Sequence, residues 1–168
     1  PAGFRPPNLI YITSIDGYLY CVDDMKRQVI WSVSLGTPMS QSPLAAGDVV
    51  YVVTDEAELM CLDALTGEPV WGPALDVKQL LTISKDRVYG LNPRGDLVLI
   101  STENGSRLRT IALNGTAIPF ANTQTDRLFL TNPQGLVVCL HEVQNEFPRL
   151  HVDVGETTEE TDAPTKTE

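Results

Sequence analysis

The sequence lacks several features that mark common classes of protein. No apolar run approaches the roughly 18 residues that a membrane helix needs. Basic residues are scarce, since 12 Lys and Arg stand against 22 Asp and Glu and the formal charge is −10 at pH 7. An acidic chain with no basic stripe is not expected to bind nucleic acid or an anionic membrane.

Residues that build catalytic and metal sites are equally sparse. The chain has 3 Cys and 2 His. Neither His141 nor His151 has a Cys or Asp partner at metal-ligand spacing, and we expect both at the surface. The sequence contains no phosphate-binding loop and no Ser/His/Asp arrangement. We therefore predict no catalytic residue and no metal ligand.

The end of the chain differs in composition from the rest. Residues 153–168 hold six acidic residues against one lysine, which accounts for five of the ten net negative charges. With almost no apolar residues, this segment is predicted to be an acidic disordered tail. Because the sequence begins with Pro, we expect a mature, excised or incomplete chain, and favour the C-terminal part of a longer protein.

What the sequence does contain is a repeat of about 40 residues. Four copies lie near residues 8–47, 48–85, 86–125 and 126–152. One position of the repeat is aromatic in every copy, and the four copies have Tyr11, Tyr51, Tyr89 and Phe129 there. A fixed period of this length is typical of repeat architectures.

Each copy is predicted to form strands and no amphipathic helix. A short β-branched and aromatic run, such as "LIYIT" or "VVYVV", leads into a tight turn and a second strand. Gly17, Gly95 and Gly135 supply the positive φ of this turn. The second copy has Glu56-Ala57 there, so its turn must differ or carry strain. A third strand and a fourth short strand complete the copy.

Four short strands in every 40 residues predict an all-β fold, a β-propeller of four-stranded antiparallel blades. About four blades are present, which makes a partial or half propeller. Only seven residues precede Asn8, so we expect the first blade to lack its innermost strand. A blade cannot bury its faces alone. The unpaired faces could therefore meet the remainder of a longer chain or allow self-association with another chain.

The stretch "CLDALTGEPVW" is predicted to join neighbouring blades. Asp63 caps the turn, Gly67 allows a left-handed backbone, and the ring of Trp71 lies between two blades with its N–H on a turn carbonyl. Asp23 and Trp31 take the same places in the first copy. Arg109 and Arg149 stand at the tryptophan position in the last two copies.

The remaining polar and sulfur-containing candidates fit structural roles. Cys21, Cys61 and Cys139 share one position of the repeat, so we predict buried strand residues too far apart to form disulfides. Asp16 and Asp96 are expected to bond the backbone of their own turns. Two Asn-Gly pairs, Asn104-Gly105 and Asn114-Gly115, match the glycosylation pattern but are predicted to mark turns.

At this point the residues resemble a known family. The stretch "VYVVTDEAELMCLDALTGEPVW" is similar to the pyrroloquinoline quinone (PQQ) repeat of quinoprotein-like β-propellers, of the type found in planctomycetes. The resemblance assigns the tryptophan-docking motif to Asp63, Thr66, Gly67 and Trp71, with "SIDGYLYCVD" as a similar segment in the first copy. It implies the fold more strongly than a cofactor.

The resemblance implies two possible functions. The family includes periplasmic alcohol dehydrogenases that use PQQ and calcium, and non-enzymatic members that resemble the lipoprotein of the outer-membrane β-barrel assembly machinery. Its enzymes carry a vicinal Cys pair, and no two cysteines are adjacent here. We expect a non-catalytic scaffold or interaction module with an unidentified protein partner and no cofactor. The alternative is part of a PQQ- and calcium-dependent quinoprotein dehydrogenase. Resemblance also implies a periplasmic or exported protein.

Overall fold

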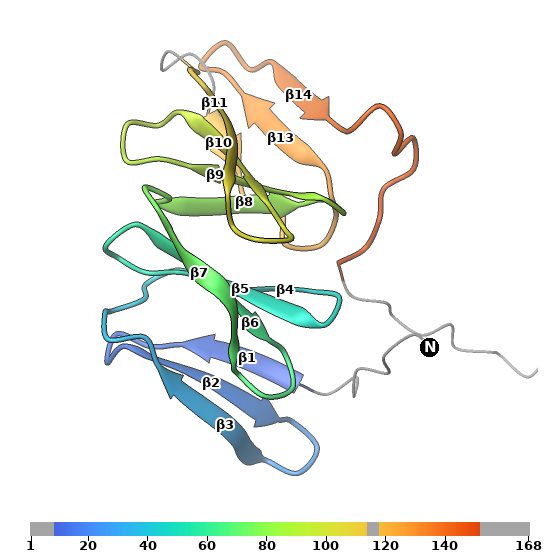
Figure 1. Cartoon of the computed structure of the whole chain (residues 1–168). Coiled ribbons are helices and arrows are strands. Elements are labelled where there is room, and N and C mark those ends of the chain that lie inside the picture. The colour runs from blue at the N-terminus through green and yellow to red at the C-terminus, as the bar shows by residue number, and fades with distance from the viewer. Residues whose placement is uncertain (1–8, 114–117, 152–168) are drawn as a thin grey trace, which may run out of the picture.

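The computed structural model describes residues 9–113 and 118–151, and all regular structure in these residues is β-strand (Figure 1). The strands form four antiparallel sheets, which we call blades 1 to 4. Blade 1 contains β1 (Leu9–Thr13), β2 (Tyr18–Asp23) and β3 (Gln28–Ser34). Blade 2 contains β4 (Leu44–Ala46), β5 (Val49–Val53), β6 (Glu58–Asp63) and β7 (Pro69–Leu75). Blade 3 contains β8 (Gln79–Ile83), β9 (Arg87–Leu91), β10 (Leu97–Ser101) and β11 (Arg107–Ile111). Blade 4 contains β12 (Ile118–Phe120), β13 (Leu128–Thr131) and β14 (Val137–Leu140).

The repeat of the sequence is the repeat of the fold. Strands β1–β3 match β5–β7, and within each blade a strand pairs with the next one along the chain. The four sheets lie one after another, from β1–β3 at one end to β12–β14 at the other (Figure 1). The predicted class, an all-β partial propeller of about four blades, is confirmed. Within the described residues, blades 1 and 4 have three strands and blades 2 and 3 have four.

The tight turn between the second and third strands of blade 2 keeps the geometry of its glycine-containing equivalents. Gly17, Gly95 and Gly135 have φ of 85°, 85° and 87°, and Ala57 has φ of 64°. The Ala57 N–H donates to Thr54 O at 3.0 Å, as the equivalent glycines do in their own turns. Since a non-glycine residue rarely adopts positive φ, the strain expected at Ala57 is present.

The core lies between the blades rather than within one sheet. Because successive residues of a strand face opposite sides, each blade sends one set of side chains to the preceding blade and one to the following blade. The buried residues group accordingly at three junctions. Their central members are Leu19, Val50, Val52 and Leu62 (blades 1 and 2), Tyr51, Cys61, Trp71, Val88 and Val98 (blades 2 and 3), and Leu81, Leu97 and Leu128 (blades 3 and 4).

The two terminal blades each leave one face open. On blade 1, Ile10 and Ile12 are 45% and 47% exposed, and on blade 4, Phe120 and Val137 are 55% and 64% exposed. Cys139 lies on this open side of blade 4 and is exposed, so the prediction that all three cysteines are buried is wrong for this one. Its two repeat equivalents are buried because a following blade covers them.

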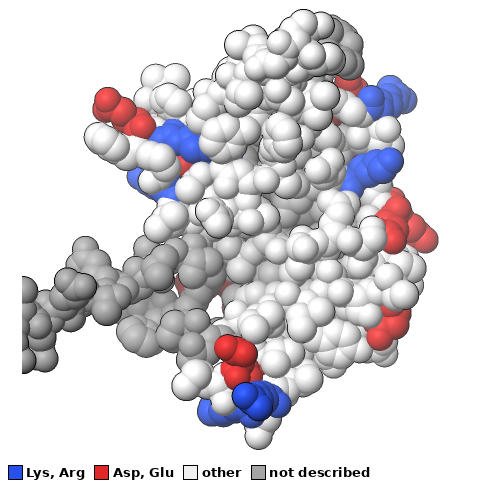
Figure 2. All heavy atoms as spheres, turned by 180° about the vertical axis from the view of Figure 1, so that it is seen from behind, with Lys and Arg blue, Asp and Glu red and all other residues white. Residues whose placement is uncertain are grey.

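Charged side chains are scattered over the surface. Figure 2 shows them near the edges of one side of the molecule, with a broad area between them that carries none. Across residues 9–113 and 118–151, no helix is long and apolar enough to cross a membrane.

Candidate functional site

Two tryptophans connect neighbouring blades through the same contacts. The Trp71 ring is 9% exposed, and its Nε1 donates to Thr102 O of blade 3 at 2.8 Å. The ring covers Gly105 so closely that a Cβ there would lie 2.5 Å from its Cε3 atom. Trp31 does the same to blade 2, where its Nε1 donates to Ala64 O at 3.3 Å and its Cε3 lies 2.7 Å from a Cβ built on Gly67. Each ring thus reaches the turn of the following blade.

The turn that receives Trp31 is ordered by one carboxylate. Asp63 Oδ1 accepts the N–H groups of Leu65 and Thr66 at 2.9 and 2.8 Å and the Thr66 hydroxyl at 3.1 Å. The bond from the Thr66 N–H is the main reason why the pKa of Asp63 lies below its ordinary value of 3.8. In blade 1, Asp23 Oδ1 accepts the Lys26 N–H at 2.9 Å in the equivalent turn.

The predicted docking residues belong to two different junctions between blades. Asp63, Thr66 and Gly67 share one turn with the Trp31 ring, whereas Trp71 belongs to the next junction and meets Gly105. Sequence reasoning did not single out Gly105, although its alignment with Gly67 is a signal that could have found it. That these residues hold the blades together stays a prediction, to be tested by stability measurements.

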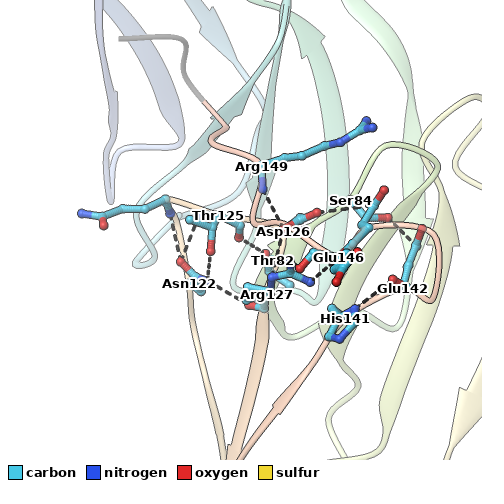
Figure 3. Close-up of polar contacts among 12 residues, drawn as sticks. Thr82, Ser84, Asn122, Thr125, Asp126, Arg127, His141, Glu142, Glu146 and Arg149 are labelled. Carbon is cyan, nitrogen blue, oxygen red and sulfur yellow. Dashed lines mark hydrogen bonds and ion pairs between the residues drawn. The ribbon is translucent and has the colours of Figure 1, made fainter.

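The junction between blades 3 and 4 has no tryptophan and uses a carboxylate instead. Glu142 Oε1 accepts Ser84 Oγ at 2.6 Å, Tyr89 Oη at 3.0 Å and Arg87 Nη1 at 3.3 Å. Figure 3 shows Glu142 beside Ser84 at the ends of the strands. Arg109, which the alignment places at the tryptophan position, is exposed on β11. Hydrogen bonds thus take the place of the ring.

Residues 141–151, the part of the chain described after β14, do not form a fourth strand of blade 4. These residues, which we call the C-terminal segment, return instead to the turn before β13. Arg149 O accepts the Asp126 N–H at 3.1 Å, and Leu150 bridges Thr125. Arg149, which the alignment places at the tryptophan position, therefore does not lie on a strand of blade 4. Its side chain points away from the polar cluster (Figure 3).

A buried pair of opposite charges holds this segment. The side chains of Asp126 and Arg127 are 4% and 6% exposed, with Arg127 Nε 3.7 Å from Asp126 Oδ1. Arg127 donates to the carbonyls of Asn145 and Glu146, both at 2.8 Å, and Asp126 Oδ1 accepts the Arg149 N–H at 3.0 Å. Both charges are therefore compensated by partners in the C-terminal segment or beside it.

His151 ties the same segment to two other blades. It is 8% exposed, with Nε2 2.8 Å from Ile83 O and Nδ1 3.0 Å from Thr123 O. Its carbonyl accepts the Gly47 N–H of blade 2 at 3.2 Å. The prediction of a surface residue is wrong for His151, because the return of the chain buries it. It holds for His141, which is exposed.

A cavity of about 390 Å³ opens beside the C-terminal segment. Its apolar wall includes Val49, Tyr51 and Cys61, and its rim includes Lys85 and Arg149. Burial raises the pKa of the Cys61 thiol to about 11 and also raises that of Tyr51, so this wall is uncharged at neutral pH. Asp126 and His151 also line the cavity, so an apolar wall lies beside groups of both charges.

The C-terminal segment exposes three large apolar side chains. Val143, Phe147 and Leu150 are 94%, 78% and 58% exposed, although the backbone that carries them is fixed by buried charges. Large apolar side chains held at the surface mark sites of interaction with other molecules. In the part of the chain that the structure describes, no three His, Cys, Asp or Glu side chains are grouped so as to hold a metal ion.

Comparisons with known proteins agree with the geometry. A family model described as "Outer membrane protein assembly factor BamB" matches residues 2–164. No curated protein matches the chain. BamB from Moraxella catarrhalis is 19% identical, with a TM-score of 0.60 over 79% of this chain and 46% of that one. The chain therefore spans about half the length of the BamB structure that it matches.

Two further structures share the fold. The quinohemoprotein alcohol dehydrogenase from Comamonas testosteroni is 20% identical, with a TM-score of 0.51 over 61% of this chain and 19% of that one. The computationally designed Ika4 protein is 13% identical, with a TM-score of 0.64 over 82% of this chain and 87% of that one. At these identities the likeness shows the fold alone.

Proposed function

Since the chain belongs to the family of the outer membrane protein assembly factor BamB, we propose that it is a non-catalytic scaffold that binds another protein. The match to the family model over residues 2–164 is the observation that carries this function. The proposed contact residues are the exposed apolar side chains of the C-terminal segment, Val143, Phe147 and Leu150.

The construction of the segment supports this assignment. An exposed apolar loop usually gains little from binding if it must first be ordered. Here the Asp126–Arg127 pair and His151 hold the backbone of the segment, so less ordering is needed when the three apolar side chains bind. A rigid scaffold that carries its binding residues on loops is the common arrangement in repeat proteins.

The experiment places a photo-reactive amino acid at Phe147 and, as a matched control, at Leu75. Leu75 is also largely exposed, at 61%, but lies on β7. Irradiation of cells that produce the protein should give one discrete crosslinked product at position 147, which Val143→Asp abolishes. Identical products at both positions, or none at position 147, would contradict the proposal.

We further propose that the protein acts at the outer membrane or in the periplasm. The description of the family supports this location. Fractionation of cells that produce the protein from its natural gene tests it, with markers for the cytoplasm, periplasm and both membranes. Recovery with the cytoplasmic marker alone would refute the location without affecting the fold.

The alternative, part of a quinoprotein dehydrogenase, is supported by the likeness to the Comamonas testosteroni enzyme. The family description, which names an assembly factor, favours the scaffold over the enzyme. We therefore propose that the chain acts without a cofactor. Titration with PQQ and calcium, followed by absorbance and dye reduction with alcohols, should give no saturable binding and no activity.

A further inference from the structure

The cavity of about 390 Å³ lies between the two internal blades, 2 and 3. Val49 and Val70 line it from blade 2 and Ile83 lines it from blade 3, so aliphatic side chains border it on both sides. Its volume falls within the range of sites that hold small molecules, roughly 300–1,000 Å³. Of the proposed protein-contact residues, Leu150 alone lines it. The cavity is therefore a largely separate candidate for a binding site.

Tyr51 in the cavity wall lacks a hydrogen bond that its repeat equivalent makes. In blade 1, Tyr11 Oη donates to Ala64 O of the following blade at 2.9 Å. Thr102 occupies the position of Ala64 in blade 3, but within the described ranges its carbonyl accepts a tryptophan N–H and no bond from Tyr51. The polar side chain beside the Tyr51 hydroxyl is the Cys61 thiol, a weak partner. A tyrosine that is 3% exposed thus keeps hydrogen-bonding capacity at the cavity.

Two cations line the same cavity without an ion pair to any side chain of residues 9–113 and 118–151. They are Lys85 and Arg149, and both are exposed. Asp126, the carboxylate in the lining, is 4% exposed and already compensated by Arg127 and by the Arg149 N–H at 3.0 Å. The Arg149 side chain points away from this polar cluster (Figure 3). The two cations are therefore available to an anion from outside the chain.

We propose that the cavity binds an aliphatic carboxylic acid in its ionised form. The aliphatic chain lies against Val49, Val70 and Ile83, and the carboxylate lies beside Lys85 and Arg149. An inorganic anion would leave the apolar wall unused, and a hydrocarbon would leave the two cations unused. An acid with an apolar chain uses both, because burial of the chain and charge-assisted hydrogen bonds to the carboxylate act together.

The first test is calorimetric titration of the full chain with decanoate at neutral pH. We expect saturable binding of one molecule per chain. Decan-1-ol keeps the aliphatic chain without the charge, and acetate keeps the charge without the chain, so each should bind at least about tenfold more weakly. Added salt should weaken the binding of decanoate more than that of decan-1-ol. Equal binding of decan-1-ol and decanoate, or no saturable binding of decanoate, would overturn the proposal.

Two matched double variants test the role of the cations. Lys85→Gln combined with Arg149→Gln removes both charges from the cavity and should weaken decanoate binding about tenfold. Lys78→Gln combined with Arg94→Gln removes two other exposed charges, outside the lining, and should bind decanoate as the wild type does. Equal weakening in both double variants would show a general effect of net charge and would contradict the site.

A larger side chain at Val70 tests the apolar wall. Val70 lies on β7 and is 52% exposed, so Val70→Trp should fold, fill the cavity and abolish binding. Ile30→Trp makes the same change at the equivalent position of blade 1, where Ile30 is 49% exposed and lies outside the lining, and should leave binding unchanged. If the Val70→Trp chain binds decanoate like the wild type, the proposal is wrong.

Methyl NMR of the wild-type chain locates the ligand without any substitution. Saturating decanoate should shift the methyl signals of Val49 and Ile83, which line the cavity. It should leave those of Leu19 and Val52 in place, because they are buried at the junction of blades 1 and 2. Shifts at the junction of blades 1 and 2 without shifts at the cavity would place the ligand elsewhere and refute the assignment.

Discussion

Gly95 and Gly105 both have positive φ, at 85° and 71°, but only Gly105 lies against a side chain. A Cβ at Gly105 would be 2.5 Å from the Trp71 ring, whereas one at Gly95 would meet nothing within 4 Å. The two residues thus separate the two reasons for a glycine, the backbone conformation that it allows and the close approach that it permits.

We expect Gly105→Ala to destabilise the protein more than Gly95→Ala. Both variants carry the strain of an alanine at positive φ, about 1 kcal/mol, and only the first must also displace the Trp71 ring. Urea unfolding of both variants measures the difference. In the background of Trp71→Ala the difference should vanish, since there is no ring to displace. Equal losses in the wild-type background would show that the close contact has no energetic effect.

Asp63 gives a prediction that depends on pH. The Thr66 N–H lowers the pKa of Asp63 in the folded protein. The ionised carboxylate therefore contributes to the free energy of unfolding above the pKa of the unfolded chain, and this contribution is lost as pH falls through the pKa of the folded protein. We expect Asp63→Ala to cost about 0.5–2 kcal/mol at pH 7, as loss of a comparable cap does. The difference in the free energy of unfolding between the variant and the wild type, measured by denaturant titration, should become smaller below pH 4. A gap independent of pH would mean that the charge has no part in the turn.

At the scale of the strands, the sequence was sufficient wherever a local pattern decided the structure. The β-branched and aromatic run "VVYVV" and the turn residues that follow it predict β5 and β6, and the same pattern predicts the equivalents in all four copies. Even the strain at Ala57 followed from the missing glycine. These features depend on residues close together in the chain, which is why a single sequence can show them.

The path of the C-terminal segment could not be predicted in this way. His151 is buried by contacts with Ile83 and Gly47, which lie 68 and 104 residues earlier in the sequence. The pair Asp126-Arg127 looks like Asp86-Arg87 of the third copy, and only the former is buried. The difference arises because residues 145–149 fold back onto Asp126 and Arg127, which is a property of tertiary structure.

The buried pair provides a test of how independent this segment is. Removing one partner of a buried ion pair costs about 3–5 kcal/mol, because the other charge stays uncompensated. We expect Arg127→Ala to release the C-terminal segment while blades 1 and 2 keep their structure. Hydrogen exchange should therefore rise at the Gly47 and His151 amides and stay unchanged at β2 and β6. A uniform rise across all four blades would mean that the segment unfolds only with the whole domain.

On the scale of the molecule, most of the stability is a sum over junctions between neighbouring blades, to which the C-terminal segment adds the bond from Gly47 of blade 2 to His151. The junction of blades 2 and 3 has the largest buried cluster and contains Trp71, whose ring is 9% exposed. The junction of blades 1 and 2 contains Trp31, which is only partly buried and whose Nε1 bond is longer, 3.3 Å against 2.8 Å.

Truncation of the two tryptophans should therefore have unequal effects. Trp71→Ala removes the ring from the central junction and should cost about 3–5 kcal/mol, whereas Trp31→Ala should cost less because the ring keeps contact with solvent. Chemical denaturation of both variants measures the losses. Without the central junction, blades 1 and 2 should unfold separately from blades 3 and 4. Hydrogen exchange should then show two groups of amides with different rates, one from each pair of blades. A loss below about 1 kcal/mol for Trp71→Ala, the range of surface substitutions, would show that the ring does not hold the blades together.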